Sequence, residues 1–268
     1  MAHALTPPAG LRLVALDIDD TLIPWRGTLA RETVDAIRTV RAAGIEVVLA
    51  SGRSVRSVLP VALELGIDEA WALCSNGAIT VRIAGGEAAE HGRRTFDPRG
   101  IMAAIRELDP LAPAAVEMSG LSFMYDGDPY AFEQLPVSQA ADFPEAVAFL
   151  SVSSRVIDAA TFAAITAAHP VHSVPYPHEE WASIDVVSSD AGKGAALAAL
   201  AAAHGFAPHE CAAVGDYLND IPMLEWAGWA VAMGQAPPEV RAVADAVVAR
   251  VEDHGAAQAL LAIAAASS

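Results

Sequence analysis

Short apolar runs alternate along the chain with longer amphipathic segments, and this alternation predicts strands and helices in turn. The first part of the chain gives a strand over 11–19, a helix over 31–44, a strand over 45–51, a helix over 55–66 and a strand over 70–75. Strands separated by single helices pair in parallel through right-handed crossovers, with helices on both faces of the sheet. The pattern therefore predicts one half of a doubly wound α/β domain.

The same alternation returns near the C-terminus, with helices over 193–205, 221–228 and 238–245 and strands over 211–215, 229–234 and 246–249. Between the two halves the pattern changes to mixed strands and helices, and Gly85 with Gly86 predicts a hairpin turn. We expect a doubly wound parallel sheet formed by 1–80 and 189–268, with an α+β cap over 81–188. Such an insertion leaves the sheet at the rim where α/β domains bind ligands.

Composition narrows the function classes. The chain has 268 residues, of which 54% are hydrophobic, and its formal net charge is −17 with only 16 basic residues. A charge of this sign disfavours nucleic acid or an anionic membrane as a partner. Cys74 and Cys211 each lie in an apolar run, as expected for buried free thiols in a reducing compartment. We expect a soluble cytoplasmic protein without a secretory signal or membrane span, as a monomer or homodimer.

Two carboxylates follow the first predicted strand. Asp17 and Asp19 stand two positions apart in LVALDIDDTL, so in extended backbone both side chains point to one face. Asp17 is placed to attack phosphorus as a nucleophile, and Asp19 to move protons to and from the reacting oxygens. Thr21 lies in the same turn. Turn or cap carboxylates are the alternative for this motif taken alone.

Three further motifs follow other predicted elements. Ser51 and Gly52 come after the second strand, where a hydroxyl and a backbone N–H can donate to a phosphoryl oxygen, although a helix N-cap is the usual role of such a serine. Lys193 begins an alanine-rich helix, where the helix dipole disfavours a cation unless an anion lies close; the alternative is an exposed lysine that is merely tolerated. In GDYLND, Asp216 is a candidate ligand of a divalent cation, and Asp220 either holds the water ligands of that cation or caps the next helix. An oxygen-only shell of this kind suits Mg2+.

The chain resembles the haloacid dehalogenase superfamily in four motifs and in their order: DIDDT, SGR, GKG and GDYLND. The insertion lies between the second and the third of these motifs. LCSNGA and AVAMG are similar to the Cof-type phosphatases of that superfamily. The resemblance implies Asp17 as nucleophile and metal ligand, Asp19 as acid and base with its carbonyl on Mg2+, and Asp216 as the third metal ligand. It also implies a phosphate site made of Ile18, Ser51, Gly52, Lys193 and Asn219. The chain departs from the usual pattern at Asp20, where glycine is commoner, and at Gln235, where asparagine is usual.

The resulting prediction is a Mg2+-dependent phosphatase acting on a small phosphorylated metabolite, with sugar phosphates as the class suggested by the family. Candidate substrate contacts are Asn76, His178, Glu179 and Trp181, although the last three also fit a cap core residue beside two solvated ones. A phosphomutase with the same core is one alternative. A receiver-like switch or a non-catalytic protein that binds a phosphorylated ligand is another, and intact Asp17 and Lys193 disfavour the latter.

Overall fold

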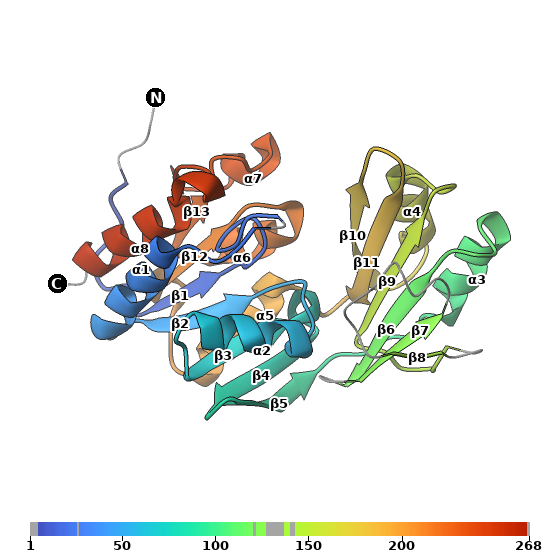
Figure 1. Cartoon of the computed structure of the whole chain (residues 1–268), viewed down its shortest axis with the longest axis horizontal. Helices are drawn as coiled ribbons and strands as arrows, with labels where there is room; N and C mark the ends of the chain where they lie inside the picture. The colour runs from blue at the N-terminus through green and yellow to red at the C-terminus, as the bar shows by residue number, and fades with distance from the viewer. Residues whose placement is uncertain (1–4, 26, 120–121, 127–136, 140–142, 267–268) are drawn as a thin grey trace. The chain divides into compact units, whose positions relative to one another are not determined.

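The structure is a computed structural model that describes residues 5–25, 27–119, 122–126, 137–139 and 143–266 (Figure 1). It divides the chain into two compact units, which we call the core unit and the cap unit. The core unit consists of Met1–His91 and Lys193–Ser268, and the cap unit of Gly92–Gly192. The two boundaries between the units, after residues 91 and 192, therefore come later in the sequence than the expected boundaries after residues 80 and 188.

The core unit is built on an eight-stranded sheet with the order β14-β13-β12-β1-β2-β3-β4-β5. Its parallel strands are β1 (Leu13–Leu16), β2 (Glu46–Ala50), β3 (Glu69–Cys74), β12 (Cys211–Gly215), β13 (Trp229–Ala232) and β14 (Ala246–Val247). β4 (Ile79–Ala84) runs antiparallel to β3, and Gly85 and Gly86, both with positive φ, turn the chain into β5 (Glu87–Arg93). The predicted hairpin thus exists, and it extends the core sheet.

Helices cover both faces of this sheet (Figure 1). The core helices are α1 (Arg31–Ala42), α2 (Val55–Glu64), α5 (Lys193–Ala203), α6 (Ile221–Trp226), α7 (Pro238–Ala242) and α8 (Gly255–Ala266), with short 3-10 turns η1 (Ser75–Gly77), η3 (Pro208–Glu210), η4 (Leu218–Asp220) and η5 (Val251–Asp253). Leu13 and Ala15 of β1 pack with Leu197 of α5 and Met223 of α6 in one buried cluster. Because side chains alternate along a strand, Val14 of β1 faces the opposite layer, where α1 and α8 lie side by side. The doubly wound prediction is confirmed.

The cap unit contains a second sheet with the order β10-β11-β9-β6-β7-β8. Its elements are α3 (Arg99–Leu108), β6 (Ala114–Ser119), β7 (Ser122–Asp126), β8 (Val137–Gln139), β9 (Phe149–Ser154), α4 (Ala159–Thr166), β10 (Val171–Pro177) and β11 (Ala182–Ser188). The strands pair antiparallel except β7 with β8. Ile101 of α3 and Phe162 of α4 are buried against Leu150 and Ile184 of this sheet. The insertion is therefore of the α+β type, as predicted.

Within residues 5–25, 27–119, 122–126, 137–139 and 143–266, no helix combines the length and the apolar character that crossing a membrane requires.

Candidate active site

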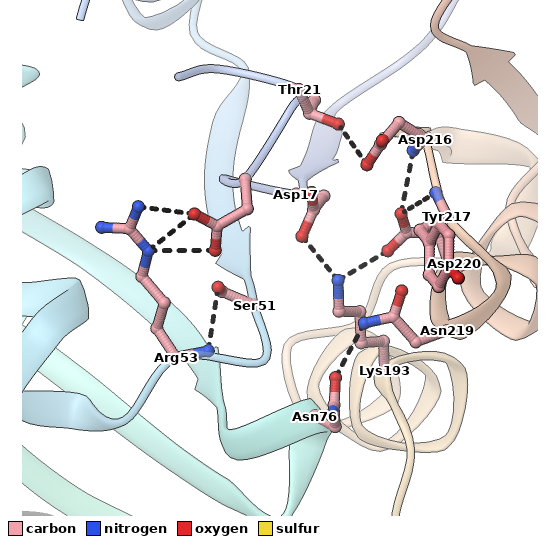
Figure 2. Close-up of polar contacts among 11 residues, drawn as sticks. Asp17, Thr21, Ser51, Arg53, Asn76, Lys193, Asp216, Tyr217, Asn219 and Asp220 are labelled. Carbon is pink, nitrogen blue, oxygen red and sulfur yellow. Dashed lines mark hydrogen bonds and ion pairs between the residues drawn. The ribbon is translucent and has the colours of Figure 1, made fainter. Parts of the chain in front are cut away.

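Polar side chains from distant parts of the chain meet at the carboxyl ends of the central core strands (Figure 2). Asp17 directly follows β1, Ser51 directly follows β2 and Asp216 directly follows β12. β1 lies between β2 and β12, and all three strands are parallel, so their carboxyl ends share one rim. The Asp17 N–H donates to the carbonyl of Val214 at 3.0 Å, which continues the ladder to the start of the site.

Lys193, the single lysine of the chain, lies at the centre of this rim. Its Nζ donates to Oδ1 of Asp17 at 2.5 Å and to Oδ1 of Asp220 at 2.6 Å, and all three residues are buried. Burial lowers the pKa of the Lys193 ammonium, but the two carboxylates more than offset it and hold that pKa above its usual range. The sequence predicted an anion next to this cation at the helix start, and the structure places two there, Asp17 and Asp220.

Two glycines allow the close approach of these elements. A Cβ at position 194, next to Lys193, would come within 2.4 Å of the carbonyl oxygen of Pro222 in α6. A Cβ at position 215 would lie 2.6 Å from Cγ of Asp220. Gly194 therefore lets α5 pack against α6, and Gly215 lets the Asp220 carboxylate fold back under the loop that carries Asp216.

Asp220 uses both of its carboxylate oxygens within the protein. Oδ1 accepts from Lys193, and Oδ2 accepts the backbone N–H groups of Asp216 at 2.9 Å and Tyr217 at 3.0 Å. It thereby closes the GDYLND loop onto the lysine. The Asp220 side chain makes no cap hydrogen bond at the start of α6. The interpretation of Asp220 as a cap of the next helix is therefore wrong.

The site carries more buried negative charge than the lysine balances. Oxygens of Asp17, Asp216 and Asp220 lie within 4.8 Å of one another, and Lys193 is the ammonium that bonds this group. Burial raises the pKa of Asp17 to about 7, and burial together with the charges of Asp17 and Asp220 raises the pKa of Asp216 to about 9. Carboxylates whose ionisation is resisted in this way form a site that a divalent cation would stabilise.

The donor set suits a hard cation. Asp17 and Asp216 offer carboxylate oxygens, and Thr21 Oγ1 donates to Oδ1 of Asp216 at 3.5 Å. Oxygen ligands of this type are those that Mg2+ binds. Because both Asp220 oxygens already accept hydrogen bonds, Asp17 and Asp216 are the better candidates for direct ligands, and Asp220 supports them.

Asp19 lies outside that cluster and is bound by Arg53, a residue that the sequence interpretation missed. Arg53 Nε donates to both carboxylate oxygens at 3.0 Å, and Nη2 donates to Oδ1 at 2.5 Å. The Asp19 side chain keeps 41% of its surface exposed. The signal was present in SGR, since an arginine close before a helix start, like Lys193, is disfavoured unless an anion lies near.

The predicted phosphate-binding groups surround the same rim. Ser51 is buried, and its Oγ accepts the backbone N–H of Arg53 at 3.1 Å. Ile18 has a buried side chain, and its carbonyl accepts the N–H of Leu22 at 2.9 Å. Asn219 donates through Nδ2 to Oδ1 of Asn76 at 2.9 Å. Gly52 packs next to that amide, because a Cβ there would lie 3.3 Å from Asn76 Oδ1.

The remaining candidate substrate contacts belong to the cap unit. His178, Glu179 and Trp181 lie in the turn between β10 and β11, and all three are exposed. The rings of His178 and Trp181 stack with their centroids 3.6 Å apart. Trp181 is thus a surface residue of the cap, and the interpretation of it as cap core is wrong.

Comparison with known proteins agrees with this geometry. A family model described as haloacid dehalogenase-like hydrolase matches residues 14–260. The chain is 27% identical to pyridoxal phosphate phosphatase YbhA of Escherichia coli, over 88% of this chain and 93% of that protein. It is 30% identical to a phosphoglycolate phosphatase of Methanoculleus marisnigri, over 88% and 89% of the two chains.

A solved structure described as a haloacid dehalogenase-like hydrolase from B. subtilis shares the fold with a TM-score of 0.75 and 25% identity, covering 93% of this chain and 99% of that one. The family match spans both strands that carry the aspartates, the lysine helix and the inserted cap. The resemblance of the motifs is confirmed, and the chain belongs to the haloacid dehalogenase-like hydrolase family.

Proposed function

We propose that this chain is a Mg2+-dependent phosphatase that hydrolyses a small phosphorylated metabolite through a phosphoaspartyl intermediate on Asp17. The observation that carries the proposal is the buried contact between Asp17 and Lys193, with an oxygen of Asp216 within 4.8 Å of one of Asp17. A carboxylate that is buried, paired with a cation and open to a metal fits a nucleophile for phosphorus.

In the first half-reaction, a carboxylate oxygen of Asp17 forms a bond to phosphorus, and the bond from phosphorus to the ester oxygen breaks. Asp19 gives its proton to that departing oxygen, so the alcohol leaves uncharged. Asp19 stands two residues from Asp17, and the forked contact from Arg53 fixes the orientation of its carboxyl group.

In the second half-reaction, the ionised Asp19 takes a proton from water while the water oxygen bonds to phosphorus. The bond from phosphorus to Asp17 breaks, and inorganic phosphate and the free carboxylate are formed. Lys193 stays bound to Asp17 and balances negative charge on the transferred group in both steps.

Asp17 and Asp216, with the backbone carbonyl of Asp19, would hold the metal. Mg2+ bound there would lower the repulsion between the phosphate and the carboxylates and stabilise charge in the transition state. Ser51, Asn219 and the backbone around Ile18 and Gly52 would bind the remaining phosphoryl oxygens.

Sugar phosphates are our first substrate class, and the names of the two relatives add pyridoxal phosphate and phosphoglycolate. These compounds share a phosphate monoester on a small polar body. The differences between them lie outside the phosphate, so the core motifs serve all three. His178, Glu179 and Trp181 of the cap are our candidates for contacts to that variable part.

A panel of phosphorylated sugars, pyridoxal phosphate, phosphoglycolate and nucleotides, assayed for release of inorganic phosphate, tests the proposal. We expect release with Mg2+ and none with EDTA. Asp17→Asn, which is nearly isosteric, should abolish turnover and leave the fold intact. Transfer of phosphate to a second hydroxyl without release would indicate a phosphomutase. Substantial activity in Asp17→Asn would contradict covalent catalysis.

A further inference from the structure

The chain contains two asparagines, Asn76 and Asn219, and they are hydrogen-bonded to each other across 143 residues of sequence. Asn219 Nδ2 is the donor and Asn76 Oδ1 the acceptor, at 2.9 Å (Figure 2). Asn76 is 4% exposed, so this amide lies inside the core unit and not on a surface that meets solvent.

Asn76 belongs to a turn with unusual backbone geometry. Ser75, Asn76 and Gly77 all have positive φ, at 51°, 53° and 82°. Residues other than glycine rarely adopt this left-handed backbone conformation, and asparagine is among those that tolerate it best. Buried non-glycine residues in this conformation persist where surrounding contacts determine them, and such positions concentrate at functional sites.

The contacts of this left-handed turn lead to the SGR loop. The N–H of Ser75 donates to the carbonyl of Arg53 at 2.8 Å, and the N–H of Asn76 donates to the carbonyl of Ser51 at 3.0 Å. The turn thus holds both ends of the segment Ser51–Arg53, while the Asn76 amide packs beside Gly52 between them.

From this arrangement we infer that Asn76 is a positioning residue, which joins the SGR loop to Asn219 so that their donors converge on one phosphate. The inference rests on the proposed function. An amide nitrogen carries two hydrogens, so the bond to Asn76 takes one and fixes the direction of the other. In this role Asn76 acts on phosphate binding through other residues. Its side chain orients Asn219, and its backbone orients Ser51.

The pairing of two lone asparagines permits a direct spectroscopic test. In the NMR spectrum of the wild-type protein labelled with 15N-asparagine, the side-chain amide region should show two NH2 groups. The spectrum of Asn76→Gly should show one, from Asn219. Glycine accepts a φ of 53°, so this variant removes the amide and keeps the turn. We expect the Asn219 resonance to move when Asn76 is removed, and the inorganic phosphate concentration at half-saturation, with Mg2+ present, to rise about tenfold.

Asn76→Asp is the matched variant, because it keeps an acceptor oxygen at the same place and tolerates the same backbone. Its Asn219 resonance should stay near the wild-type position before phosphate is added. A displaced Asn219 resonance in Asn76→Asp, or unchanged phosphate binding in Asn76→Gly, would overturn the inference. The aspartate variant serves this purpose even if the glycine variant does not fold.

A double-mutant cycle provides the kinetic test. Asn76→Gly should lower kcat/KM about tenfold, and Asn219→Ala by at least as much. If Asn76 acts through Asn219, Asn76→Gly/Asn219→Ala should be no worse than Asn219→Ala alone. Losses that multiply would mean that the two residues act independently. A wild-type chain that hydrolyses no monoester would refute the proposed function, while the resonances and the phosphate titration still decide the role of Asn76.

Discussion

Arg53 binds the carboxylate of Asp19 through two nitrogens, with Nε 3.0 Å from each oxygen and Nη2 2.5 Å from Oδ1. A guanidinium that donates in this forked way fixes the plane of the carboxylate as well as its position. The proposed acid and base is therefore aligned by the loop that also carries Ser51. Asp19 and Arg53 therefore form one unit, although they lie 34 positions apart in the sequence.

Arg53→Ala should lower kcat about 10- to 100-fold, because Asp19 loses the contact that aligns it for proton transfer. Stability should change by less than about 1 kcal/mol, since the pair is partly exposed. Arg53→Lys keeps the charge and loses the fork, so its kcat should be intermediate. Arg56→Ala, which removes an exposed arginine of α2, is the control for steady-state kinetics and thermal melts. A wild-type kcat in Arg53→Ala would show that the alignment of Asp19 by Arg53 does not contribute to catalysis.

Lys193→Met should lower kcat/KM at least about 100-fold, because the Lys193 ammonium bonds both Asp17 and Asp220. Breaking a buried ion pair leaves uncompensated charge and costs about 3–5 kcal/mol. The loss of stability in urea melts should therefore be larger at pH 8 than at pH 5, where Asp17 is protonated.

Lys193→Arg separates charge from shape at the same position. Arginine keeps the positive charge but is a planar fork, not a compact ammonium, in a site where Lys193 is 1% exposed. We expect activity well below wild type. Full activity in Lys193→Arg would show that charge alone is sufficient.

We expect the acidic cluster to make stability depend on pH and on Mg2+. Burial raises the pKa values of Asp17 and Asp216 to about 7 and about 9, above the values near 4 of the unfolded chain. Between these limits the folded state binds more protons, so without metal the free energy of unfolding should fall as pH rises from about 4 to about 9. We expect Mg2+ to bind the ionised carboxylates and thereby to reverse this loss.

Urea unfolding at pH 5, 7 and 9, with EDTA and with Mg2+, measures both effects. The gain in stability from Mg2+ should grow with pH. In Asp216→Asn the pH-dependent loss should be smaller and the Mg2+ gain should largely disappear. A gain that is equal at pH 5 and pH 9 would contradict a metal site built on these two aspartates.

The two departures from the usual family pattern contact each other. Gln235 Nε2 donates to the carbonyl of Asp20 at 2.5 Å, and its Oε1 accepts the N–H of Val251 at 3.1 Å. Asp20 has a φ of 54°, and its Oδ1 accepts the N–H of Trp25 at 2.6 Å. Gln235 thus stabilises a strained turn directly after Asp19.

Gln235→Ala should lower kcat several-fold and the midpoint of thermal unfolding by a few degrees, because the strained turn loses a bond worth about 1 kcal/mol. Asp20→Gly removes the strain, so Asp20→Gly/Gln235→Ala should recover part of both losses. Steady-state kinetics and melts of the four proteins check this. Identical effects of Gln235→Ala in both backgrounds would mean that the two positions are not coupled.

The placement of Asp17, Ser51 and Asp216 could be predicted from the sequence because each directly follows an apolar strand. In a parallel sheet, the end of the strand fixes the rim on which the next residue lies. Lys193 could be predicted for a related reason, since a cation at a helix start indicates an anion nearby.

Contacts between loops could not be predicted in the same way. The pairs Arg53 with Asp19, Gln235 with Asp20 and Asn219 with Asn76 depend on how irregular segments pass one another, and hydrophobic periodicity contains no information on that. Gly85 and Gly86 predicted a hairpin turn, but a turn signal does not say which sheet is joined by the strand before it, in which Ile79, Val81 and Ile83 are buried on one side. Here that strand joins β3 of the core.

The position of β1 has a consequence for synthesis on the ribosome. β1 pairs with β2, which emerges soon after it, and with β12, which emerges only after the whole cap unit has been translated. Until then, one edge of β1 is unpaired and Asp17 has no counterion, since Lys193 is still inside the ribosome or not yet made. β1 ends at residue 16 and β12 begins at residue 211. The nascent N-terminal half therefore presents an open strand edge and an uncompensated acid while about 195 residues are translated, which at typical elongation rates takes roughly 10 to 40 seconds. Chaperone contact during that interval should centre on β1 and its neighbours, and it should end when α5 and β12 arrive.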